Sequence, residues 1–245
     1  MDTALTCQLG HREHSDGAAP PGGGASPGVG FSCRRGRWSI LLRVSSYSAP
    51  SADVSSEASI DDGTKIWHLA QVREGAVIGR DCIVGRGAYI GSGVRLGDNC
   101  KVQNYALVYE PARLGDGVFI GPAAVLTNDH NPRAVNPDGT PKSAADWEQV
   151  GVEIGEGAAI GVRAVCVAPV AIGRWALVAA GAVVVDDVPD FALVAGVPAR
   201  RLGWVGHSGR RLEREGADTW RCPASGRLYR EQGAVLVPLP EEEDE

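Results

Sequence analysis

Aliphatic residues recur at every sixth position over a long stretch of the chain. From residue 60 to residue 131, twelve consecutive hexads each open with an aliphatic side chain. This period is neither the repeat of about 3.6 residues of an amphipathic helix nor the repeat of about 2 of a half-buried strand. The twelve openers are Ile60, Ile66, Val72, Ile78, Val84, Ile90, Leu96, Val102, Val108, Leu114, Ile120 and Leu126.

The other positions of the hexad indicate what the repeat builds. The fourth residue after an opener is usually small, as at Ala70 and Cys82, and a glycine often follows the opener directly, as at Gly79 and Gly85. This pattern fits a short strand followed by a tight corner, with glycine relieving strain where the backbone turns. Three such sides close a triangular coil, and stacked coils pair as parallel strands about 4.8 Å apart. The sequence therefore predicts an all-β parallel β-helix.

The register breaks once and then resumes. A polar, proline-rich segment spans residues 131–153, and the spacing from the opener Leu126 to the next opener, Ile154, is not a multiple of six. The segment is therefore an insertion, and a long loop in a regular solenoid is more often functional than accidental. Together the eighteen hexads predict about six coils. The resumed openers are Ile154, Ile160, Cys166, Ile172, Val178 and Val184.

Three regions follow from where the repeat starts and stops. Residues 1–58 are rich in Gly, Pro and Ser and are predicted to be a disordered or non-native tail. Residues 59–201 are predicted to form the β-helix, with the loop at 131–153. Residues 202–245 are predicted to cover its end with a short helix at 209–215, a hairpin around 222–226 and an acidic tail.

Charge and cysteine usage exclude several classes of function. The net charge is −6, but the last five residues carry five acidic groups, so the body is close to neutral. This balance argues against a nucleic-acid partner, and no apolar run approaches the roughly 18 residues of a membrane span. The six cysteines are scattered without a C-x-x-C motif, which favours reduced core thiols of a cytoplasmic protein over disulfides or a metal site.

The hexads, the loop and residues 194–200 (VAGVPAR) resemble hexapeptide-repeat acyltransferases. That resemblance implies a left-handed β-helix, acetyl-CoA as the acyl donor and a homotrimer. A narrower set of motifs is similar to the bacterial UDP-2-acetamido-3-amino-2,3-dideoxyglucuronate N-acetyltransferases, and it implies acetylation of the 3-amino group of a UDP-linked amino sugar. Another nucleotide-linked amino sugar stays open as the substrate. The motifs are IWH at 66–68, VQN at 102–104, VYE at 108–110, GP at 121–122, TNDHNPR at 127–133, LGW at 202–204 and CPASG at 222–226.

Two catalytic candidates lie where the hexads stop. N-acetylation requires both reactants in line, donors for the developing oxyanion and a route for the released proton. The resemblance places Asn128 near the reacting amine; alternatively, Asn128 only turns the chain into the loop. His130 takes the small interior slot of its hexad, which suggests that the coil opens there. An imidazole is the usual base near neutral pH, although His130 could also contact substrate or pack the loop.

Further candidates are assigned to the substrate and to the donor. Arg133 suits a carboxylate or a pyrophosphate through paired hydrogen bonds, or it is a solvated loop arginine. The resemblance implies substrate contacts for Gln103, Glu110, Trp67 and His68, although Gln71 stands where a second histidine often follows. It implies a place for acetyl-CoA along Gly161, Ala179, Ala180 and Gly181, with Arg200 and Arg201 near its phosphates. The alternative is an exposed wall residue for Gln103 and Glu110, capping of the apolar end for Trp67, and a charged surface residue at the end of the solenoid for Arg200 and Arg201.

Two other functions compete with acetyl transfer. A zinc enzyme of the γ-type carbonic anhydrase kind needs three histidines on one metal, but the repeat region holds only His68 and His130, which are far apart in sequence. We therefore predict no metal. A purely structural solenoid would have no long loop and no polar cluster on its outer faces. We expect the loop to reach a neighbouring subunit, because one flat face cannot enclose a sugar nucleotide.

Overall fold

The computed structural model describes residues 29–34, 37–42 and 45–240, and the chain divides into two units, Met1–Leu42 and Arg43–Glu245. In the first unit, β1 (Val29–Arg34) and β2 (Arg37–Leu42) form an antiparallel hairpin. The predicted disordered tail thus contains a hairpin, and residues 1–28 lie outside the described residues.

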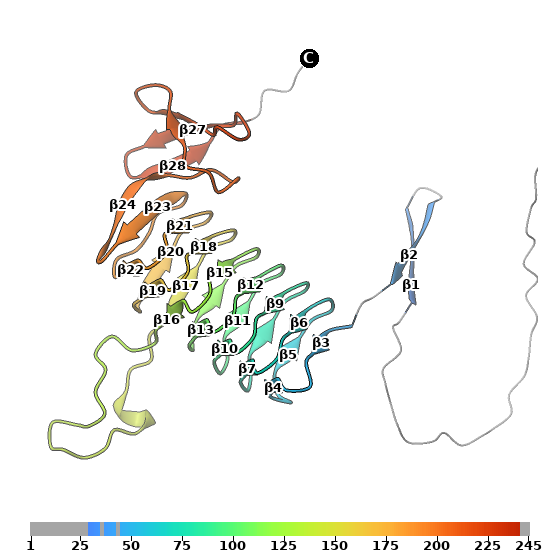
Figure 1. Cartoon of the computed structure of the whole chain (residues 1–245), viewed down its shortest axis with the longest axis vertical. Coiled ribbons are helices and arrows are strands. Elements are labelled where there is room, and N and C mark those ends of the chain that lie inside the picture. Colours follow the sequence, from blue (N-terminus) through green and yellow to red (C-terminus); the bar gives the residue numbers. More distant parts are fainter. Residues whose placement is uncertain (1–28, 35–36, 43–44, 241–245) are drawn as a thin grey trace, which may run out of the picture. The chain divides into compact units, whose positions relative to one another are not determined.

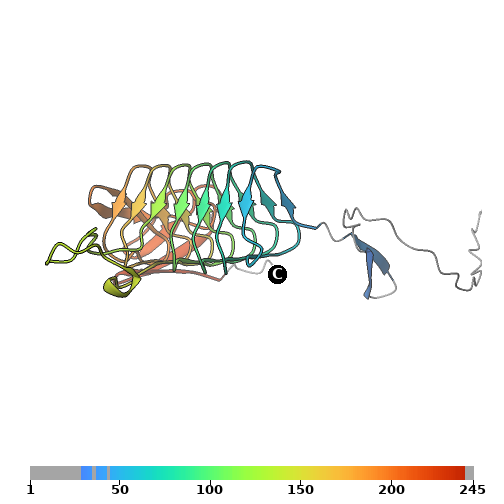
Figure 2. The same ribbon diagram turned by 90° about the horizontal axis from the view of Figure 1, so that it is seen from below.

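The second unit is built on three parallel sheets, each forming one face of a solenoid (Figure 1). Strands three hexads apart pair in register, as Val102 does with Val84 and Ile120. Figure 2 shows the strands of the stack as an evenly spaced row of arrows. This is the all-β parallel β-helix that the hexads predict, and it is consistent with the left-handed form.

We name the three faces by sheet and each corner by the faces that it joins. Face 1 contains β3 (Tyr47–Ser48), β6 (Lys65–Ile66), β9 (Ile83–Val84), β12 (Lys101–Val102), β15 (Phe119–Ile120), β18 (Ala159–Ile160), β21 (Leu177–Val178), β23 (Ala192–Gly196) and the antiparallel β24 (Ala199–Trp204). Face 2 contains β4 (Asp53–Val54), β7 (Gln71–Val72), β10 (Tyr89–Ile90), β13 (Leu107–Val108), β16 (Val125–Leu126), β19 (Val165–Cys166) and β22 (Val183–Val184). Face 3 contains β5 (Ser59–Ile60), β8 (Val77–Ile78), β11 (Arg95–Leu96), β14 (Arg113–Leu114), β17 (Val152–Ile154) and β20 (Val170–Ile172).

The interior follows the hexad. The openers from Ile66 to Leu126 and the small corner residues from Ala70 to Ala124 are buried. One buried polar residue, Thr64, satisfies its hydroxyl by donating to the carbonyl oxygen of Gly79 at 2.7 Å. The core is therefore an aliphatic column along the axis, to which each coil from β6 to β20 contributes three openers, and it continues into the cap at Trp204, Tyr229 and Leu236.

The solenoid is longer than the six coils predicted. Its first coil consists of β3, β4 and β5, so it begins at Tyr47 rather than at residue 59. Ser48 stands at the opener position of that coil and is exposed, and the aliphatic rule therefore missed it. At the other end, β21 and β22 begin a further coil and β23 adds an eighth parallel strand to face 1.

The glycines that follow openers have a different role from the one predicted. A Cβ at Gly85 would lie 2.6 Å from the backbone nitrogen of Asn104 in the next coil, and Gly85 is not in the left-handed region. That region is occupied by the third residue after the opener, as at Leu69 (φ 60°) and Tyr105 (φ 59°). Close packing between coils requires the glycine, while another residue makes the turn.

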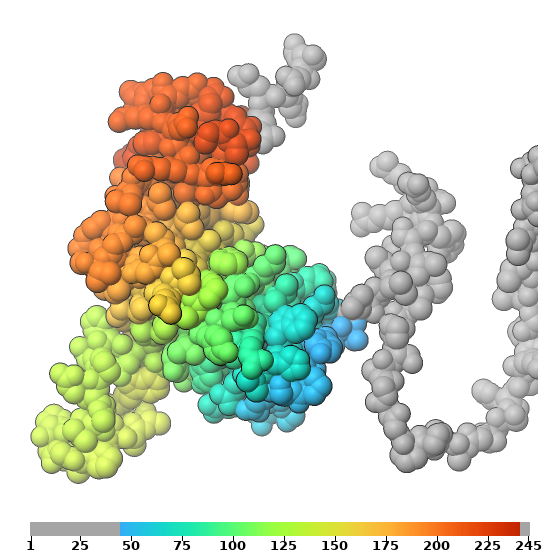
Figure 3. Space-filling model, in the orientation of Figure 1, coloured from blue at the N-terminus to red at the C-terminus, as the bar shows by residue number. Residues whose placement is uncertain are grey.

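The insertion leaves and re-enters the solenoid at nearly the same point. The backbone nitrogen of Val150 donates to the carbonyl oxygen of Asn128 at 3.3 Å. Beyond this neck the loop extends away from the body (Figures 1 and 3) and contains one 3-10 turn, η1 (Ala144–Asp146), with a capping box from Ser143 and Asp146. None of residues 127–151 is buried. The loop therefore adds no buried residue to the core, and Val150 at its neck packs against the core while half-buried.

The C-terminal cap is a four-stranded antiparallel sheet of β25 (Glu213–Arg214), β26 (Thr219–Arg221), β27 (Leu228–Gln232) and β28 (Val235–Pro238). The hairpin predicted around 222–226 is present between β26 and β27. The helix predicted at 209–215 is wrong: Arg211 bridges back to Val205 and β25 pairs with β26. Gly209 and Gly216 bracket this segment, and tertiary pairing overrides its weak helix propensity.

Candidate active site

Polar side chains form a column along the corner between faces 2 and 3. The second residue after the face 2 opener is Glu74, Ser92, Glu110 or Asn128 in four successive coils. Because coils stack about 4.8 Å apart, these side chains follow one another up the corner. The sequence shows the same spacing of three hexads, so the column could have been found by aligning the hexads in threes.

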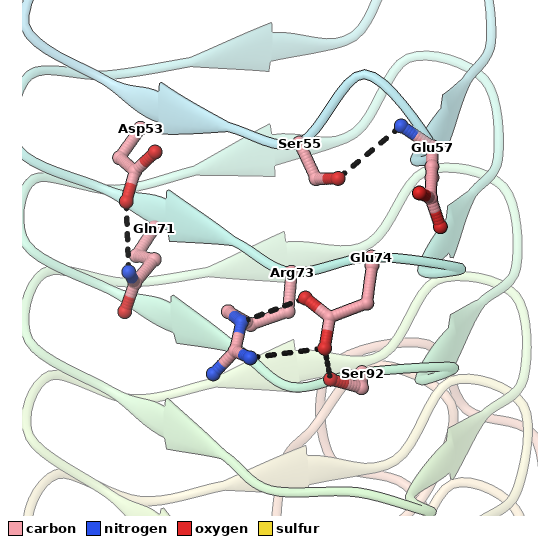
Figure 4. Close-up of polar contacts among 7 residues, drawn as sticks. All are labelled: Asp53, Ser55, Glu57, Gln71, Arg73, Glu74 and Ser92. Carbon is pink, nitrogen blue, oxygen red and sulfur yellow. Dashed lines mark hydrogen bonds and ion pairs between the residues drawn. The ribbon is translucent and has the colours of Figure 1, made fainter.

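The lower end of this column is a closed network (Figure 4). Glu74 accepts from Ser92 Oγ at 2.6 Å and from two guanidinium nitrogens of Arg73 at 2.9 Å each. These bonds, led by that of Ser92, lower the pKa of Glu74 to about 2. Nearer the start of the stack, and above this group in Figure 4, Gln71 Nε2 donates to Asp53 at 2.8 Å. The groups here already satisfy one another, so this end offers little to a ligand.

Glu110 occupies a tighter place one coil further up. A Cβ at Gly91 would lie 2.2 Å from Glu110 Oε2, so the carboxylate lies over that glycine, and the buried Oε2 has no hydrogen-bond partner among the described residues. Next to it the rings of Tyr89 and Tyr109 lie 5.1 Å apart. Burial, followed by the charge of Glu110, raises the pKa of Tyr89. The sequence analysis missed this tyrosine pair.

Asn128 lies at the top of the column, where the loop begins. Its backbone carbonyl oxygen holds the neck of the loop, but within the described residues its side chain makes no hydrogen bond. Its neighbour Thr127 accepts from the backbone nitrogen of Ala168 at 2.9 Å through Oγ1. The backbone, not the amide side chain, therefore turns the chain into the loop, and the amide remains available to a ligand.

His130 and Arg133 are exposed at the start of the loop. His130 does not fill an interior slot, because the chain has already left the wall. Its Nδ1 lies 3.3 Å from the carbonyl oxygen of Ala168. If Nδ1 carries the proton and donates it there, Nε2 is free to accept another. Arg133 NH1 donates to the carbonyl oxygen of Pro132 at 2.8 Å, and its exposed guanidinium has no acidic partner among the described residues.

The remaining substrate candidates lie on the other edge of face 2, at the corner with face 1. Trp67 and His68 follow β6 near the start of the stack, and Gln103 follows β12. Trp67 packs edge-on against Tyr47 with ring centroids 6.0 Å apart, and His68 Nδ1 lies 2.9 Å from Ser51 Oγ. Trp67 is three coils, or about 14 Å along the axis, from Asn128. One chain therefore does not bring the two sets of candidates together.

The donor candidates follow the same corner into the later coils. A Cβ at Gly161 would lie 2.5 Å from the backbone nitrogen of Ala180, so coil packing alone accounts for that glycine. Gly181 has open space around it, and Ala180 is exposed. Arg200 pairs with Asp186 at 3.2 Å. Arg201 pairs with Glu231 at 3.2 Å and lies 4.2 Å from the centroid of the Trp204 ring, which ties it to the cap.

In residues 29–34, 37–42 and 45–240, no helix reaches the length and hydropathy of a membrane span. Within the same residues, His, Cys, Asp and Glu side chains form no group of three or more that could hold a metal ion.

Family comparisons agree with this architecture. The bacterial transferase hexapeptide model (six repeats) matches residues 57–92 and 93–128, and the hexapeptide repeat of succinyl-transferase matches residues 151–185. The repeat region of this chain is thus similar to hexapeptide transferases on both sides of the loop. The matched segments stop on either side of the inserted loop, so the family repeat is the scaffold and the loop is an addition to it.

Individual relatives of this hexapeptide-repeat chain overlap only partly with it. The bifunctional protein GlmU of Alkalilimnicola ehrlichii is 35% identical over 66% of this chain and 35% of its own length. Serine acetyltransferase 4 of Arabidopsis thaliana is 38% identical over 37% of this chain and 25% of its own length. The chain thus spans about a third or less of these curated relatives. The crystal structure of PerB from Caulobacter crescentus, in complex with CoA and GDP-perosamine, superimposes with a TM-score of 0.41 and 25% identity, covering 66% of this chain and 59% of that one.

Proposed function

We propose that the protein is an acetyl-CoA-dependent N-acetyltransferase. Its substrate is the 3-amino group of a UDP-linked amino sugar of the 2-acetamido-3-amino-2,3-dideoxyglucuronate type, used for surface polysaccharide. The observation that carries the proposal is the unbonded amide of Asn128 at the top of a polar column, where the repeat gives way to a loop. The match of residues 57–128 to the bacterial transferase hexapeptide model supports acyl transfer, and matches to serine acetyltransferases support acetyl as the acyl group.

The residues divide the chemistry between them. Asn128 accepts a hydrogen bond from the neutral amine and holds it in line for attack. His130 takes the proton that the amine loses, through the Nε2 left free by the contact of Nδ1 with Ala168. Glu110 and Arg133 then contact the sugar and its carboxylate or phosphates, with Arg133 able to bind either one through paired hydrogen bonds.

The two candidate sets on opposite edges of face 2 support a homotrimer. Trp67, His68 and Gln103 of one subunit would meet Asn128, His130 and the loop of the next. Acetyl-CoA fits along the corner with face 1, where Ala179, Ala180 and Gly181 let a pantetheine chain approach the backbone. Arg200 is exposed and is held by Asp186 and by the carbonyl oxygen of Ala199, and we assign it to a CoA phosphate.

The decisive experiment is acetyl transfer from acetyl-CoA to a panel of UDP- and dTDP-linked amino sugars, measured as release of free thiol. We expect release with the UDP-linked 3-amino sugar and little with its 3-hydroxy counterpart. Absence of release with every sugar would favour a structural solenoid. A stable, fully active monomer would contradict the shared site.

A further inference from the structure

The corner between faces 1 and 2 carries positive charge and no acidic residue over its first five coils. None of the segments that build it contains Asp or Glu; they are residues 47–52, 65–70, 83–88, 101–106 and 119–124. Lys65, Arg86 and Lys101 are exposed on three of these segments. Acidic residues outnumber lysine and arginine in the chain as a whole, 30 to 24, and Asp98 and Asp116 lie at the opposite edge of face 1. This corner therefore favours an anionic ligand.

Tyr105 provides an exposed aromatic ring on this corner. The residue at the same position of the preceding coil is Gly87, and a Cβ there would lie 2.6 Å from Tyr105 Cε1. The ring therefore lies over bare backbone of the preceding coil, and the residue is still 55% exposed. Tyr105 is in the left-handed region (φ 59°), but Gly87 and Ala123 make the same turn without a ring. The fold therefore requires the turn at this position and not the aromatic side chain.

Arg86 is held against this ring. Its Nε donates to the hydroxyl oxygen of Tyr105 at 3.3 Å. Its two terminal guanidinium nitrogens make no hydrogen bond or ion pair with the described residues, and the residue is exposed. Two such nitrogens can pair with two phosphate oxygens at once. The corner therefore places a group suited to phosphate directly beside an aromatic ring.

Trp67 and Leu69 continue the same surface toward the start of the stack. They lie on this corner two coils before Tyr105 and are 41% and 54% exposed. The strands that lead into these coils, β6, β9 and β12, lie side by side in face 1 (Figure 1). An inorganic anion would leave the apolar side chains in water, whereas a nucleotide offers a base for the ring and phosphates for the guanidinium. The surface therefore fits a nucleoside diphosphate better than a simple ion.

We propose that this corner binds the nucleoside diphosphate part of the acetyl acceptor, with Tyr105 stacked on the base and Arg86 paired with the diphosphate. Gln103, already a substrate candidate, is two residues from Tyr105, so the surface is continuous with the proposed site. The choice of uridine as the nucleoside rests on the proposed function, while the surface is argued from its own charge and geometry. The adenosine bisphosphate end of CoA carries the same chemistry, and the experiment separates these two sources.

The test is calorimetric titration of the full chain with UDP in the absence of acetyl-CoA. Tyr105→Gly should weaken UDP binding at least about fivefold, the lower end of the effect of losing a base–aromatic contact, because glycine keeps the left-handed turn and removes the ring. Arg86→Gln should weaken UDP binding about tenfold and reduce its dependence on salt, because it removes a charge-assisted contact. The matched control is Arg80→Gln, which should leave the affinity unchanged. Arg80 is also exposed and also the second residue after an opener, but it lies at the opposite edge of face 1.

Three results would overturn the proposal. They are no UDP binding by the full chain, equal effects of Arg86→Gln and Arg80→Gln, and a Tyr105→Gly variant that loses affinity for adenosine 3′,5′-bisphosphate but not for UDP. The last would assign the corner to the acetyl donor. If Tyr105→Gly unfolds at a lower temperature than the wild type, Tyr105→Asn decides. Asn99 shows that asparagine accepts this turn (φ 60°), so that variant should fold and still bind UDP more weakly.

The same measurements separate this inference from the proposed function. UDP binding with the expected variant effects, but no acetyl transfer to any sugar, would support the nucleotide site and refute the proposed reaction. Acetyl transfer to a UDP-linked sugar, with UDP affinity unchanged in both Tyr105→Gly and Arg86→Gln, would refute the nucleotide site alone.

Discussion

Two asparagines at the same hexad position show how one scaffold separates structure from chemistry. Asn104 and Asn128 are each the second residue after a buried opener, at neighbouring corners of the solenoid. Asn104 Oδ1 accepts from the backbone nitrogen of Arg86, one coil below, at 2.9 Å. The side chain of Asn128 has no such partner among the described residues.

The path of the chain after each asparagine explains the difference. After Asn104 the chain continues into the next face, and the amide is used to close the corner. Asp98 and Asp116 do the same elsewhere, accepting from Arg80 and Asp98 nitrogens at 2.7 and 2.8 Å. After Asn128 the chain leaves through the loop, so the amide is not needed for the wall. Interrupting the repeat therefore frees a polar group on an otherwise rigid surface.

Deleting the loop should cause the largest loss of activity that this difference between the two corners predicts. We expect a chain in which two glycines replace residues 132–149 to lose activity by at least about a hundredfold, since the loop completes the site. Its melting temperature should change little, because none of those residues is buried and the neck is closed by the contact between Val150 and Asn128. Full activity in the shortened chain would show that the corner alone suffices.

His130→Ala tests whether the opened corner holds a base. Turnover should fall by about a hundredfold, which is within the range for losing general-base catalysis. Added imidazole should restore part of the rate, since the exposed position leaves room for it. A loss without rescue would instead assign His130 to packing against Ala168.

The sequence was sufficient to predict the faces of the solenoid. It was not sufficient to predict the two ends of the solenoid or the geometry of the candidate site. A buried opener every six residues is a strong constraint, so the faces, their register and the insertion could be predicted. The first coil was missed because Ser48 replaces the aliphatic opener. The cap was misassigned because pairing of Arg211 with Val205 depends on distant contacts. The sequence could name Asn128, but only the structure shows that its amide is unbonded.

Asn128→Ala should lower turnover at least about tenfold, the effect expected from losing one contact to a reacting group. Affinity for acetyl-CoA and the melting temperature should stay near the wild-type values, because the amide binds neither the wall nor the loop. Initial rates at saturating sugar nucleotide over a range of acetyl-CoA concentrations give turnover and the dependence on acetyl-CoA, and a thermal unfolding curve gives the melting temperature. Wild-type turnover in this variant would refute the role assigned to the opened corner.

Asn104→Ala should have the smallest effect of these changes. Unlike Asn128→Ala, it should lower the stability of the fold and leave turnover unchanged. Losing the acceptor of the Arg86 nitrogen should lower the free energy of unfolding by about 0.5–1.5 kcal/mol, or the melting temperature by about 2–4 °C per kcal/mol, with turnover unchanged. Asn104→Asp is the matched control. A carboxylate keeps the acceptor oxygen, as Asp98 shows at its own corner, so it should recover the lost stability. If Asn104→Ala instead reduced turnover and left the free energy of unfolding unchanged, Asn104 would also contact the substrate. The two asparagines would then differ only in how much each contributes to turnover.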